Sequence, residues 1–315
     1  MADAPTLLVA DLGGTSMKIG AVVDGVPQAI HQRVASSNFR TRDPLGAMAE
    51  VLSGFASEHR LSPEAVVMTV PGFVDRDFDH ALYVANIPEL NGLAVASGLS
   101  ARLGKPVMLE RDAVLLLQGE QLQGAAQGQD CVLGIFFGTG VGAAFIDDGE
   151  VFRGAGWALE IGHMPIHGDA EPLDGLKADS LEVYASGRRL NALAVHHAVA
   201  VEDLFRPGGP PALQADLDLF VRDQAFATAS VMLMLCPKAL VLGGGILDMA
   251  GYPRDALVRQ IRERATLPPS RALDVRFAQL GWRAALHASA RLVSERLSAP
   301  ARPPSIPQED ALHAR

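Results

Sequence analysis

The residues best suited to chemistry near the start of the chain lie at a glycine bend between two apolar stretches. They combine small, hydroxyl-bearing and charged side chains: Asp11, Gly13, Gly14, Thr15 and Lys18. Successive backbone N–H groups in a tight bend form an anion-binding nest, and glycine lets a ligand approach the backbone closely. Thr15 adds a hydroxyl donor, Lys18 adds a cation, and Asp11 can hold Mg²⁺ through water, because this ion usually keeps several waters. The bend therefore predicts a site for a phosphate group and Mg²⁺.

A second bend of the same kind occurs later in the chain. When Thr15 is aligned with Thr139, the preceding glycine of each segment also coincides, and an Asp-Gly pair follows at the same distance. Each segment reads as a strand, a bend, a second strand and a hairpin turn. We interpret the match as an internal duplication, although hairpins with glycine bends also resemble one another by chance. Two such bends would clamp a polyphosphate from both sides. The second bend consists of Gly138, Thr139 and Gly140.

Three consecutive glycines end a further apolar stretch. They are Gly243, Gly244 and Gly245. Because glycine carries no side chain, such a run offers a flat backbone surface on which a purine base can lie. Each of these glycine features alone reads as an ordinary turn. Together they predict a nucleotide site.

Strand and helix signals alternate along the chain and must position these groups. Apolar runs predict strands at residues 6–11, 17–23, 65–72, 105–110 and 238–245, and a pair of strands within 130–149. Helical spacing predicts helices at residues 45–60, 113–124, 225–236, 254–265 and 283–297. Alternation of this kind is typical of an α/β protein with a largely parallel sheet.

The length of 315 residues suits two domains better than one core. We expect a small N-terminal α/β domain at residues 1–115 and a large C-terminal α/β domain at residues 116–282. The helix at 283–297 is expected to pack back on the N-terminal domain. The tail at 298–315 is rich in proline, alanine and charge, which predicts disorder.

Composition and charge exclude several classes of protein. The net charge of −9 argues against sequence-independent binding of nucleic acid, which requires clustered Lys and Arg. No apolar run reaches the roughly 18 residues that a membrane span needs, and the start of the chain does not resemble a secretory signal. Cys131 and Cys236 lie in apolar runs and are expected to be buried free thiols. We therefore expect a cytoplasmic protein without nucleic-acid or membrane partners.

An ordered series of motifs resembles one known family. The stretches DLGGTSMK, VPGFVD, NIPELNG, ERDA, GTGVG, LEIGH, SLE and VLGGG follow one another as in the ROK group of sugar kinases and sugar-responsive repressors. The resemblance covers roughly residues 6–295. It implies a two-domain, actin-like ATPase fold with duplicated ribonuclease H-like halves and an interdomain cleft. It also implies phosphorylation of a hexose by ATP with Mg²⁺, and a homodimer.

Asp112 matches the catalytic aspartate of this family. Phosphoryl transfer needs a sugar hydroxyl aligned with the γ-phosphate and a carboxylate that accepts its proton. An ordinary aspartate suffices for this task when the attack of the nucleophile is little advanced in a loose transition state. The alternative is that Asp112 caps the helix that begins at Ala113. The two roles are compatible, because a cap would hold the carboxylate in place.

The resemblance also assigns residues to the sugar. They match family positions near the substrate: Gly72, Asn86, Arg111, Asp112, Glu160, His163 and Glu182. Carboxylates accept hydrogen bonds from sugar hydroxyls, and an imidazole can donate or accept. From spacing alone, Glu160 and His163 read as a surface pair and Glu182 as an ordinary acid on a helix surface, whereas Asn86 reads equally as a turn residue.

The chain departs from the family pattern at two places. The family usually has Asn before the catalytic aspartate, whereas this chain has Arg111, which is longer and only donates hydrogen bonds. Many relatives also carry a Cys-x-Cys-Gly-x-x-Gly-Cys zinc site before the LE motif. Here Ser180 stands at its last position, without a cysteine nearby. We therefore expect no structural zinc, a segment held by packing, and Asp174 and Asp179 as solvated loop residues.

These observations predict an ATP-dependent kinase for the 6-hydroxyl of a sugar. The RDA motif and VLGGGILDMAGYPRDAL resemble the D-allose kinase branch most, so D-allose is the preferred acceptor. Glucokinase and N-acetylhexosamine kinase activities are the alternatives within the same class. A non-catalytic sugar sensor is the alternative of another class. A DNA-binding repressor is disfavoured, because the first predicted strand begins near residue 6 and leaves no room before it for a helix-turn-helix module.

Overall fold

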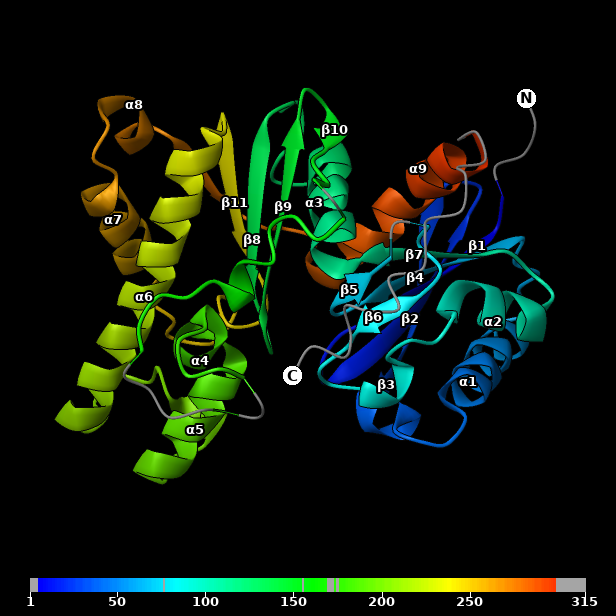
Figure 1. Cartoon of the computed structure of the whole chain (residues 1–315), viewed down its shortest axis with the longest axis horizontal. Coiled ribbons are helices and arrows are strands. Elements are labelled where there is room, and N and C mark those ends of the chain that lie inside the picture. The colour runs from blue at the N-terminus through cyan, green and yellow to red at the C-terminus, as the bar shows by residue number, and fades with distance from the viewer. Residues whose placement is uncertain (1–4, 76, 155, 169–172, 174–175, 299–315) are drawn as a thin grey trace. The chain divides into compact units, whose positions relative to one another are not determined.

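The computed structural model describes residues 5–75, 77–154, 156–168, 173 and 176–298 (Figure 1). The chain forms two compact units. Unit 1 comprises Met1–Leu12, Ser16–Arg111 and Ser289–Arg315, and unit 2 comprises Gly13–Thr15 and Asp112–Ala288. The boundaries expected from the sequence lay at residues 115 and 282, whereas the units divide between Arg111 and Asp112 and within the last helix. The tail expected to be disordered lies, from residue 299 onward, outside the described residues.

Unit 1 contains a five-stranded sheet with the order β3-β2-β1-β4-β7. The strands are β1 (Leu7–Leu12), β2 (Ser16–Val23), β3 (Val26–Ala35), β4 (Ala65–Val70) and β7 (Val107–Arg111). β1, β4 and β7 are parallel, and β2 pairs with both β1 and β3 in the antiparallel sense. β1 and β4 are buried along their whole length, which explains their unbroken apolar sequences.

One hydrophobic core joins the sheet of unit 1 to two helices, α1 (Pro44–Glu58) and α2 (Val95–Leu103). Met48 and Leu52 of α1 and Leu99 of α2 are fully buried in this core. Asp43 caps α1 by accepting a hydrogen bond from the N–H of Gly46. A two-stranded ribbon, β5 (Phe73–Val74) with β6 (Ala81–Tyr83), completes the unit.

Unit 2 repeats this topology with the order β10-β9-β8-β11-β12. Its strands are β8 (Val132–Phe137), β9 (Val141–Asp147), β10 (Glu150–Val151), β11 (Ala239–Gly243) and β12 (Asp274–Phe277). β9 is antiparallel to β8 and β10, and β11 is parallel to β8 and β12. Each sheet therefore begins with a meander of three antiparallel strands. Two further strands, parallel to the first strand of the meander, extend the sheet on its other side. The duplication predicted from the aligned bends is confirmed by this shared topology.

Helices cover both faces of the second sheet. Val132 and Phe136 of β8 pack with α3 (Asp112–Gln123), whereas the intervening Leu133 and Ile135 pack with the core that contains α6 (Pro211–Leu235) and α7 (Arg254–Arg264). Successive side chains of a strand point to opposite faces, so β8 supplies both cores. Figure 1 shows α6 and α7 side by side on one face.

Shorter elements complete the described part of the chain. The helices are α4 (Leu181–Ala185), α5 (Gly187–His197), α8 (Pro268–Arg271) and α9 (Ala284–Ser298). The 3₁₀ turns are η1 (Ser36–Phe39), η2 (Pro88–Leu90), η3 (Ile161–His163), η4 (Val201–Asp203) and η5 (Gly281–Arg283). Within unit 1, Arg296 of α9 pairs with Glu110 of β7 at 3.1 Å, which ties the end of this helix to the sheet.

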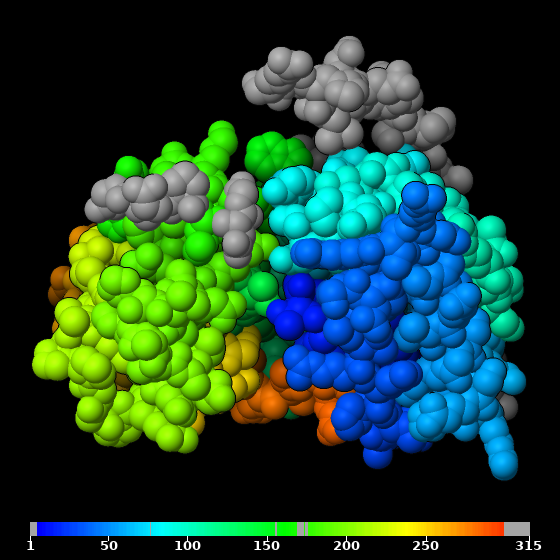
Figure 2. Space-filling model, turned by 90° about the horizontal axis from the view of Figure 1, so that it is seen from below, coloured from blue at the N-terminus to red at the C-terminus, as the bar shows by residue number. Residues whose placement is uncertain are grey.

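Several elements were not expected from the sequence. β3 is an edge strand whose residues are all exposed or half-buried, so it lacks an apolar run, and Figure 2 shows this blue part of unit 1 at the surface. The helix expected at 225–236 begins earlier, at Pro211. Its first half was not predicted, because polar side chains there conceal the helical spacing. β12 and the helices α2, α4 and α5 are short and were also missed.

The cysteines are free, but the expectation that both are buried is wrong. Cys131 is half-buried, whereas Cys236 is exposed at the C-terminal cap of α6, where the apolar run ends. Among the described residues, helices that combine the length and apolar character required to cross a bilayer are absent.

Candidate active site

The bend of unit 2 links β8 directly to β9. Gly138 donates a hydrogen bond to the carbonyl of Gly140 at 2.9 Å, which closes the bend around Thr139. The carbonyl of Gly138 in turn accepts from the N–H of Gly187, the first residue of α5, at 2.8 Å. The backbone of the predicted phosphate-binding bend is therefore held from within the hairpin and from the neighbouring helix.

The first bend belongs to the same unit. Gly13–Thr15 group with unit 2, and the Thr15 hydroxyl oxygen lies 2.9 Å from that of Thr139. These are the two residues that the aligned repeats placed at equivalent positions. The structure therefore brings the two predicted phosphate-binding bends together through their threonines.

Asp11 lies at the end of β1 in unit 1 and is almost fully buried. One of its oxygens accepts a hydrogen bond from the Thr69 hydroxyl at 3.0 Å, and the other lies 3.1 Å from the Lys18 ammonium group. Thr69 also accepts the N–H of Leu12, so it connects β4 to the carboxylate and to the backbone of β1. The antiparallel register of β1 and β2 sets Lys18 directly opposite Asp11.

Asp112 is the first residue of α3 and follows β7 without a break. Its Oδ1 accepts the N–H of Ala113 at 2.7 Å, so the carboxylate is oriented by the start of the helix. A methyl group at Gly142 of β9 would lie 3.8 Å from the same oxygen. The predicted catalytic aspartate therefore stands beside the hairpin that carries the bend of unit 2.

The carboxylate of Glu182 in α4 contacts the bend of unit 2. Its Oε1 accepts the N–H of Val141 at 2.8 Å, and its Oε2 accepts from Arg188 at 2.8 Å in a largely buried ion pair. A methyl group at Gly140 would overlap Oε1, so only glycine allows the carboxylate to lie this close. In this arrangement the carboxylate of Glu182 positions the bend of unit 2, a role that the sequence did not suggest. Arg188 was missed because no recognisable pattern marks it.

The LEIGH segment lies against the same glutamate. A methyl group at Gly162 would come within 2.7 Å of Glu182 Oε1, so this turn of η3 packs tightly on α4. Glu160 and His163 flank Gly162, and the N–H of His163 donates to the Glu160 carbonyl at 3.1 Å. Glu160 is half-buried and His163 is exposed. Unit 2 therefore gathers these three predicted sugar residues and the bend in one neighbourhood.

The segment in place of the family's zinc site is packed by apolar side chains. Leu176 forms a small core with Val183 and Tyr184 of α4. Ser180 is buried, and its hydroxyl donates to the Lys177 carbonyl at 2.9 Å. Asp179 is exposed, whereas Asp174 lies outside the described residues.

The triple glycine lies next to the bend of unit 2. Gly244 has a φ of +97°, and a methyl group there would overlap the backbone of Phe137, the residue before Gly138. Ile246 donates to the Phe137 carbonyl at 3.1 Å, which fixes the turn after β11. A methyl group at Gly245, by contrast, would meet nothing within 4 Å. The predicted adenine surface thus borders the predicted phosphate site.

Unit 1 carries the remaining predicted sugar residues. Gly72 lies against β6, where a methyl group would overlap the Tyr83 carbonyl, so the close packing of this ribbon by itself requires glycine. Asn86 is half-buried, and its backbone carbonyl accepts from Arg40 at 2.9 Å. Arg111 ends β7 and is only 5% exposed.

The residue before Arg111 was missed by the sequence analysis. Glu110 is fully buried; its Oε1 accepts the N–H of Arg111 at 3.0 Å, and its Oε2 pairs with Arg296. The guanidinium of Arg296 lies 3.2 Å from the ring centroid of Phe78. The available signal was a glutamate directly after the apolar run of the strand VMLER, because a buried carboxylate requires a partner.

Comparisons with known proteins identify the family of the chain. The family model described as ROK family matches residues 8–296. An N-acetyl-D-glucosamine kinase of Photobacterium profundum is 30% identical over an alignment of 256 residues, and the match covers 75% of this chain and 82% of that protein.

Solved structures of the same family superpose on the chain. The ROK family glucokinase from Streptomyces griseus, in complex with glucose and AMPPNP, has a TM-score of 0.77 at 26% identity and covers 91% of this chain and 98% of its own. The ROK hexokinase from Thermus thermophilus has a TM-score of 0.74 at 28% identity, with 93% and 99% covered. The actin-like ATPase fold predicted from the motifs is confirmed.

Proposed function

The chain belongs to the ROK family and is an ATP-dependent sugar kinase, and we propose that it phosphorylates the 6-hydroxyl of an N-acetylated hexosamine. The similarity to an N-acetyl-D-glucosamine kinase over three quarters of the chain supports this acceptor. The motifs predicted D-allose as the preferred acceptor, but this sugar does not occur in the names of the relatives described above. D-Allose is kept as the second candidate because Arg111, whose change from asparagine suggested it, is buried at the end of β7 directly before Asp112.

The single observation that carries the proposal is the grouping of residues in unit 2 around the β8–β9 bend. Thr15 meets Thr139, Glu182 holds Val141, and Asp112 lies beside Gly142. A nest of backbone N–H groups with two hydroxyls suits the phosphates of ATP. The glycines after β11, beside Phe137, offer the surface for adenine.

Asp112 is proposed to act as the general base. Its carboxylate accepts the proton of the sugar 6-hydroxyl while a bond forms between that oxygen and the γ-phosphorus. The bond between the γ-phosphorus and the bridging oxygen breaks, and ADP leaves with its electron pair. Because Asp112 Oδ1 is held by the N–H of Ala113, the carboxylate needs little reorientation before the transfer.

The other predicted residues are proposed to position the reactants. In this proposal the sugar hydroxyls are oriented by the residues predicted from the motifs, namely Gly72, Asn86, Arg111, Glu160, His163 and Glu182. A buried carboxylate beside a lysine suits Mg²⁺ bound through water, so Asp11 is proposed to hold the ion and Lys18 to contact a phosphate. Mg²⁺ supplies charge neutralisation at the β- and γ-phosphates when it is bound.

A coupled assay of ADP release tests the proposal with four acceptors at equal concentration. These are N-acetyl-D-glucosamine, N-acetyl-D-mannosamine, D-glucose and D-allose. We expect the highest kcat/KM with an N-acetylated sugar, and ³¹P and ¹H NMR of the product should place the phosphate on C6. A preference for D-allose or D-glucose would overturn the acceptor but keep the kinase. Tight sugar binding without any ADP release would instead support the sensor alternative.

We also propose that the chain works as a homodimer, as the family resemblance implies. The exposed apolar side chains Leu219, Phe226 and Met234 along α6 are candidates for burial in such a contact. Light scattering coupled to gel filtration should give twice the chain mass. A single-chain mass at tens of micromolar protein would reject the dimer.

A further inference from the structure

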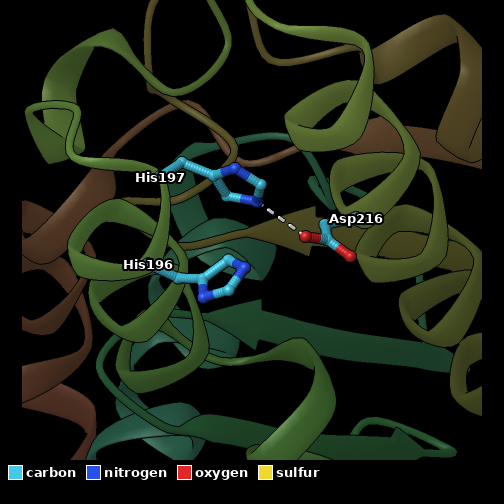
Figure 3. Close-up of side chains that lie close together, drawn as sticks. All are labelled: His196, His197 and Asp216. Atoms are coloured by element: carbon cyan, nitrogen blue, oxygen red, sulfur yellow. Dashed lines mark hydrogen bonds and ion pairs between the residues drawn. The ribbon is translucent and has the colours of Figure 1, made fainter.

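A cluster of two histidines and an aspartate lies outside the proposed kinase site. His196 and His197 end α5, and Asp216 lies in the second turn of α6 (Figure 3). One ligand atom of each residue lies within 4.8 Å of the others. His197 Nε2 is 2.7 Å from Asp216 Oδ2, and the two imidazole rings stand almost perpendicular with centroids 4.7 Å apart.

We propose that these three side chains form a binding site for a divalent transition-metal ion of the Zn²⁺ type. Two imidazole nitrogens and one carboxylate oxygen are ligands that Zn²⁺ prefers, whereas Mg²⁺ favours sites made of oxygen alone. The cluster supplies three protein ligands and leaves further positions of the ion to solvent. The site is independent of the proposed sugar specificity.

Binding of the metal ion requires a movement of the ligand atoms in the cluster. Zn²⁺ takes nitrogen and oxygen ligands at about 2.0–2.2 Å in tetrahedral geometry, so two ligand atoms around one ion stand about 3.4 Å apart. The atoms of the cluster, which lie within 4.8 Å of one another, need to move by about 1 Å to reach this spacing. His196 is exposed, and its ring nitrogens have no hydrogen-bond or ion-pair partner among the described residues, so its imidazole can turn toward the other two at small cost.

The surroundings favour a cation at this position. The last carbonyls of α5 carry the partial negative charge of a helix C-terminus, and both histidines lie in this last turn. Asp216 adds a carboxylate from the facing helix and already orients the ring of His197. A bound ion would therefore neutralise the carboxylate and link the end of α5 to the start of α6.

The site is well separated from the phosphate-binding bend. α5 begins at Gly187, which donates to Gly138, and the helix rises by about 14 Å over residues 187–195 before His196 is reached. Loss of His196 should therefore leave the turnover of Mg²⁺-ATP and sugar unchanged. This separates a failure of the metal site from a failure of the proposed kinase function.

The test is a Zn²⁺ titration of the full, metal-stripped chain against a chromophoric chelator, with Mg²⁺ present to occupy the nucleotide site. We expect a site with micromolar or tighter affinity that is weakened at least tenfold by His196→Ala and by Asp216→Asn, since a lost ligand costs at least what a lost supporting residue costs. His31→Ala is the matched control, because it removes an exposed histidine of β3 in the other unit.

Two results would overturn the proposal. One is a wild-type chain that binds no Zn²⁺ below millimolar concentration, which would leave the His197–Asp216 pair as a hydrogen bond between two helices. The other is unchanged Zn²⁺ affinity in both His196→Ala and Asp216→Asn, which would place the ion elsewhere. Anomalous diffraction at the zinc edge from a soaked crystal should show the ion between α5 and α6, and a peak at another position would have the same negative meaning.

Discussion

The hydroxyl groups of Thr15 and Thr139 share a hydrogen bond of 2.9 Å, although 124 residues separate them in the chain. The two threonines occupy equivalent bends of a duplicated hairpin, each between the first and second strand of its repeat. Both hydroxyls can also donate to a phosphate oxygen. The pair therefore joins the two bends.

Removing either hydroxyl should weaken the binding of ATP. A neutral hydrogen bond contributes about 0.5–1.5 kcal/mol, so Thr139→Ala should raise the KM for ATP by about 3- to 10-fold with a smaller change in kcat. Thr15→Ala should have a similar effect, and the double variant should cost less than the sum because the two hydroxyls interact. Thr41→Ala, an exposed threonine outside both bends, is the control. Unchanged KM values in both single variants would contradict a role of the pair in nucleotide binding.

Asp112→Asn should abolish most of the activity without unfolding the protein. General-base assistance contributes about 10²–10⁴-fold, so we expect kcat to fall by at least a hundredfold. The asparagine oxygen can still accept the N–H of Ala113, so the thermal midpoint should stay close to that of the wild type. A variant that keeps more than about a hundredth of the wild-type kcat would rule out this role.

Two glycines of the same bend should respond very differently to alanine. A methyl group at Gly140 overlaps the carboxylate of Glu182, which Val141 and Arg188 hold in place, whereas one at Gly138 meets its nearest atom at 4.0 Å. Overpacking of this kind costs about 1–3 kcal/mol. Gly140→Ala should therefore lower the free energy of unfolding in urea and raise the KM for ATP. Equal stability of Gly140→Ala and Gly138→Ala would show that the side chain of Glu182 can move away from the added methyl group at little cost in free energy.

Arg188→Ala should destabilise unit 2 more than any single loss at the surface. The guanidinium pairs with Glu182 at 2.8 Å, and the two side chains are only 7% and 12% exposed. Removing one partner of a buried ion pair leaves an uncompensated charge and costs about 3–5 kcal/mol. Urea denaturation should report this loss. Arg206→Ala, whose pair with Asp203 is largely exposed, should change stability by less than about 1 kcal/mol.

His287 should make the folded protein less stable in mild acid. Burial lowers the pKa of His287 below its usual value, and the nearby charge of Glu120 offsets only part of this effect. The folded state therefore binds fewer protons at this site than the unfolded state, so the contribution to stability is present above the unfolded pKa of about 6.5 and is lost as the pH falls through the lowered folded value.

The measurement is the difference in unfolding free energy between pH 7.5 and pH 5, compared between the wild type and His287→Gln. The variant should lose less stability on acidification than the wild type. His31→Gln, at an exposed position, should lose as much as the wild type. Identical losses in His287→Gln and the wild type would show that the lowered pKa contributes nothing.

Much of the fold could be predicted because its signals are local. The unbroken apolar runs of β1 and β4 and the glycine bends at Gly14 and Gly138 are properties of a few adjacent residues. The duplication could be read from spacing alone. β3 could not, because an exposed edge strand has neither an apolar run nor a clean alternation.

In the candidate site, too, features that depend on neighbouring residues could be predicted, whereas contacts between distant residues could not. Asp112 was recognisable from its motif and from its place at the start of a helix, where the N–H of Ala113 orients its carboxylate. Its role as a general base stays a prediction. The attachment of Glu182 to Val141 and Arg188 was not visible, since Val141 lies 41 residues away in the chain. The pairing of Glu110 with Arg296 spans 186 residues and depends on where α9 packs.

The sequence by itself determined the residue types, their order and the alternation of strands and helices, because these follow from neighbouring side chains and their periodicity. Only the tertiary structure decided which distant groups meet: Thr15 with Thr139, Glu182 with the bend, and His197 with Asp216. The physical reason is that burial and hydrogen bonding between remote segments are settled when whole sheets and helices pack. The residues adjacent to a given residue in the sequence do not indicate which distant residues it will contact.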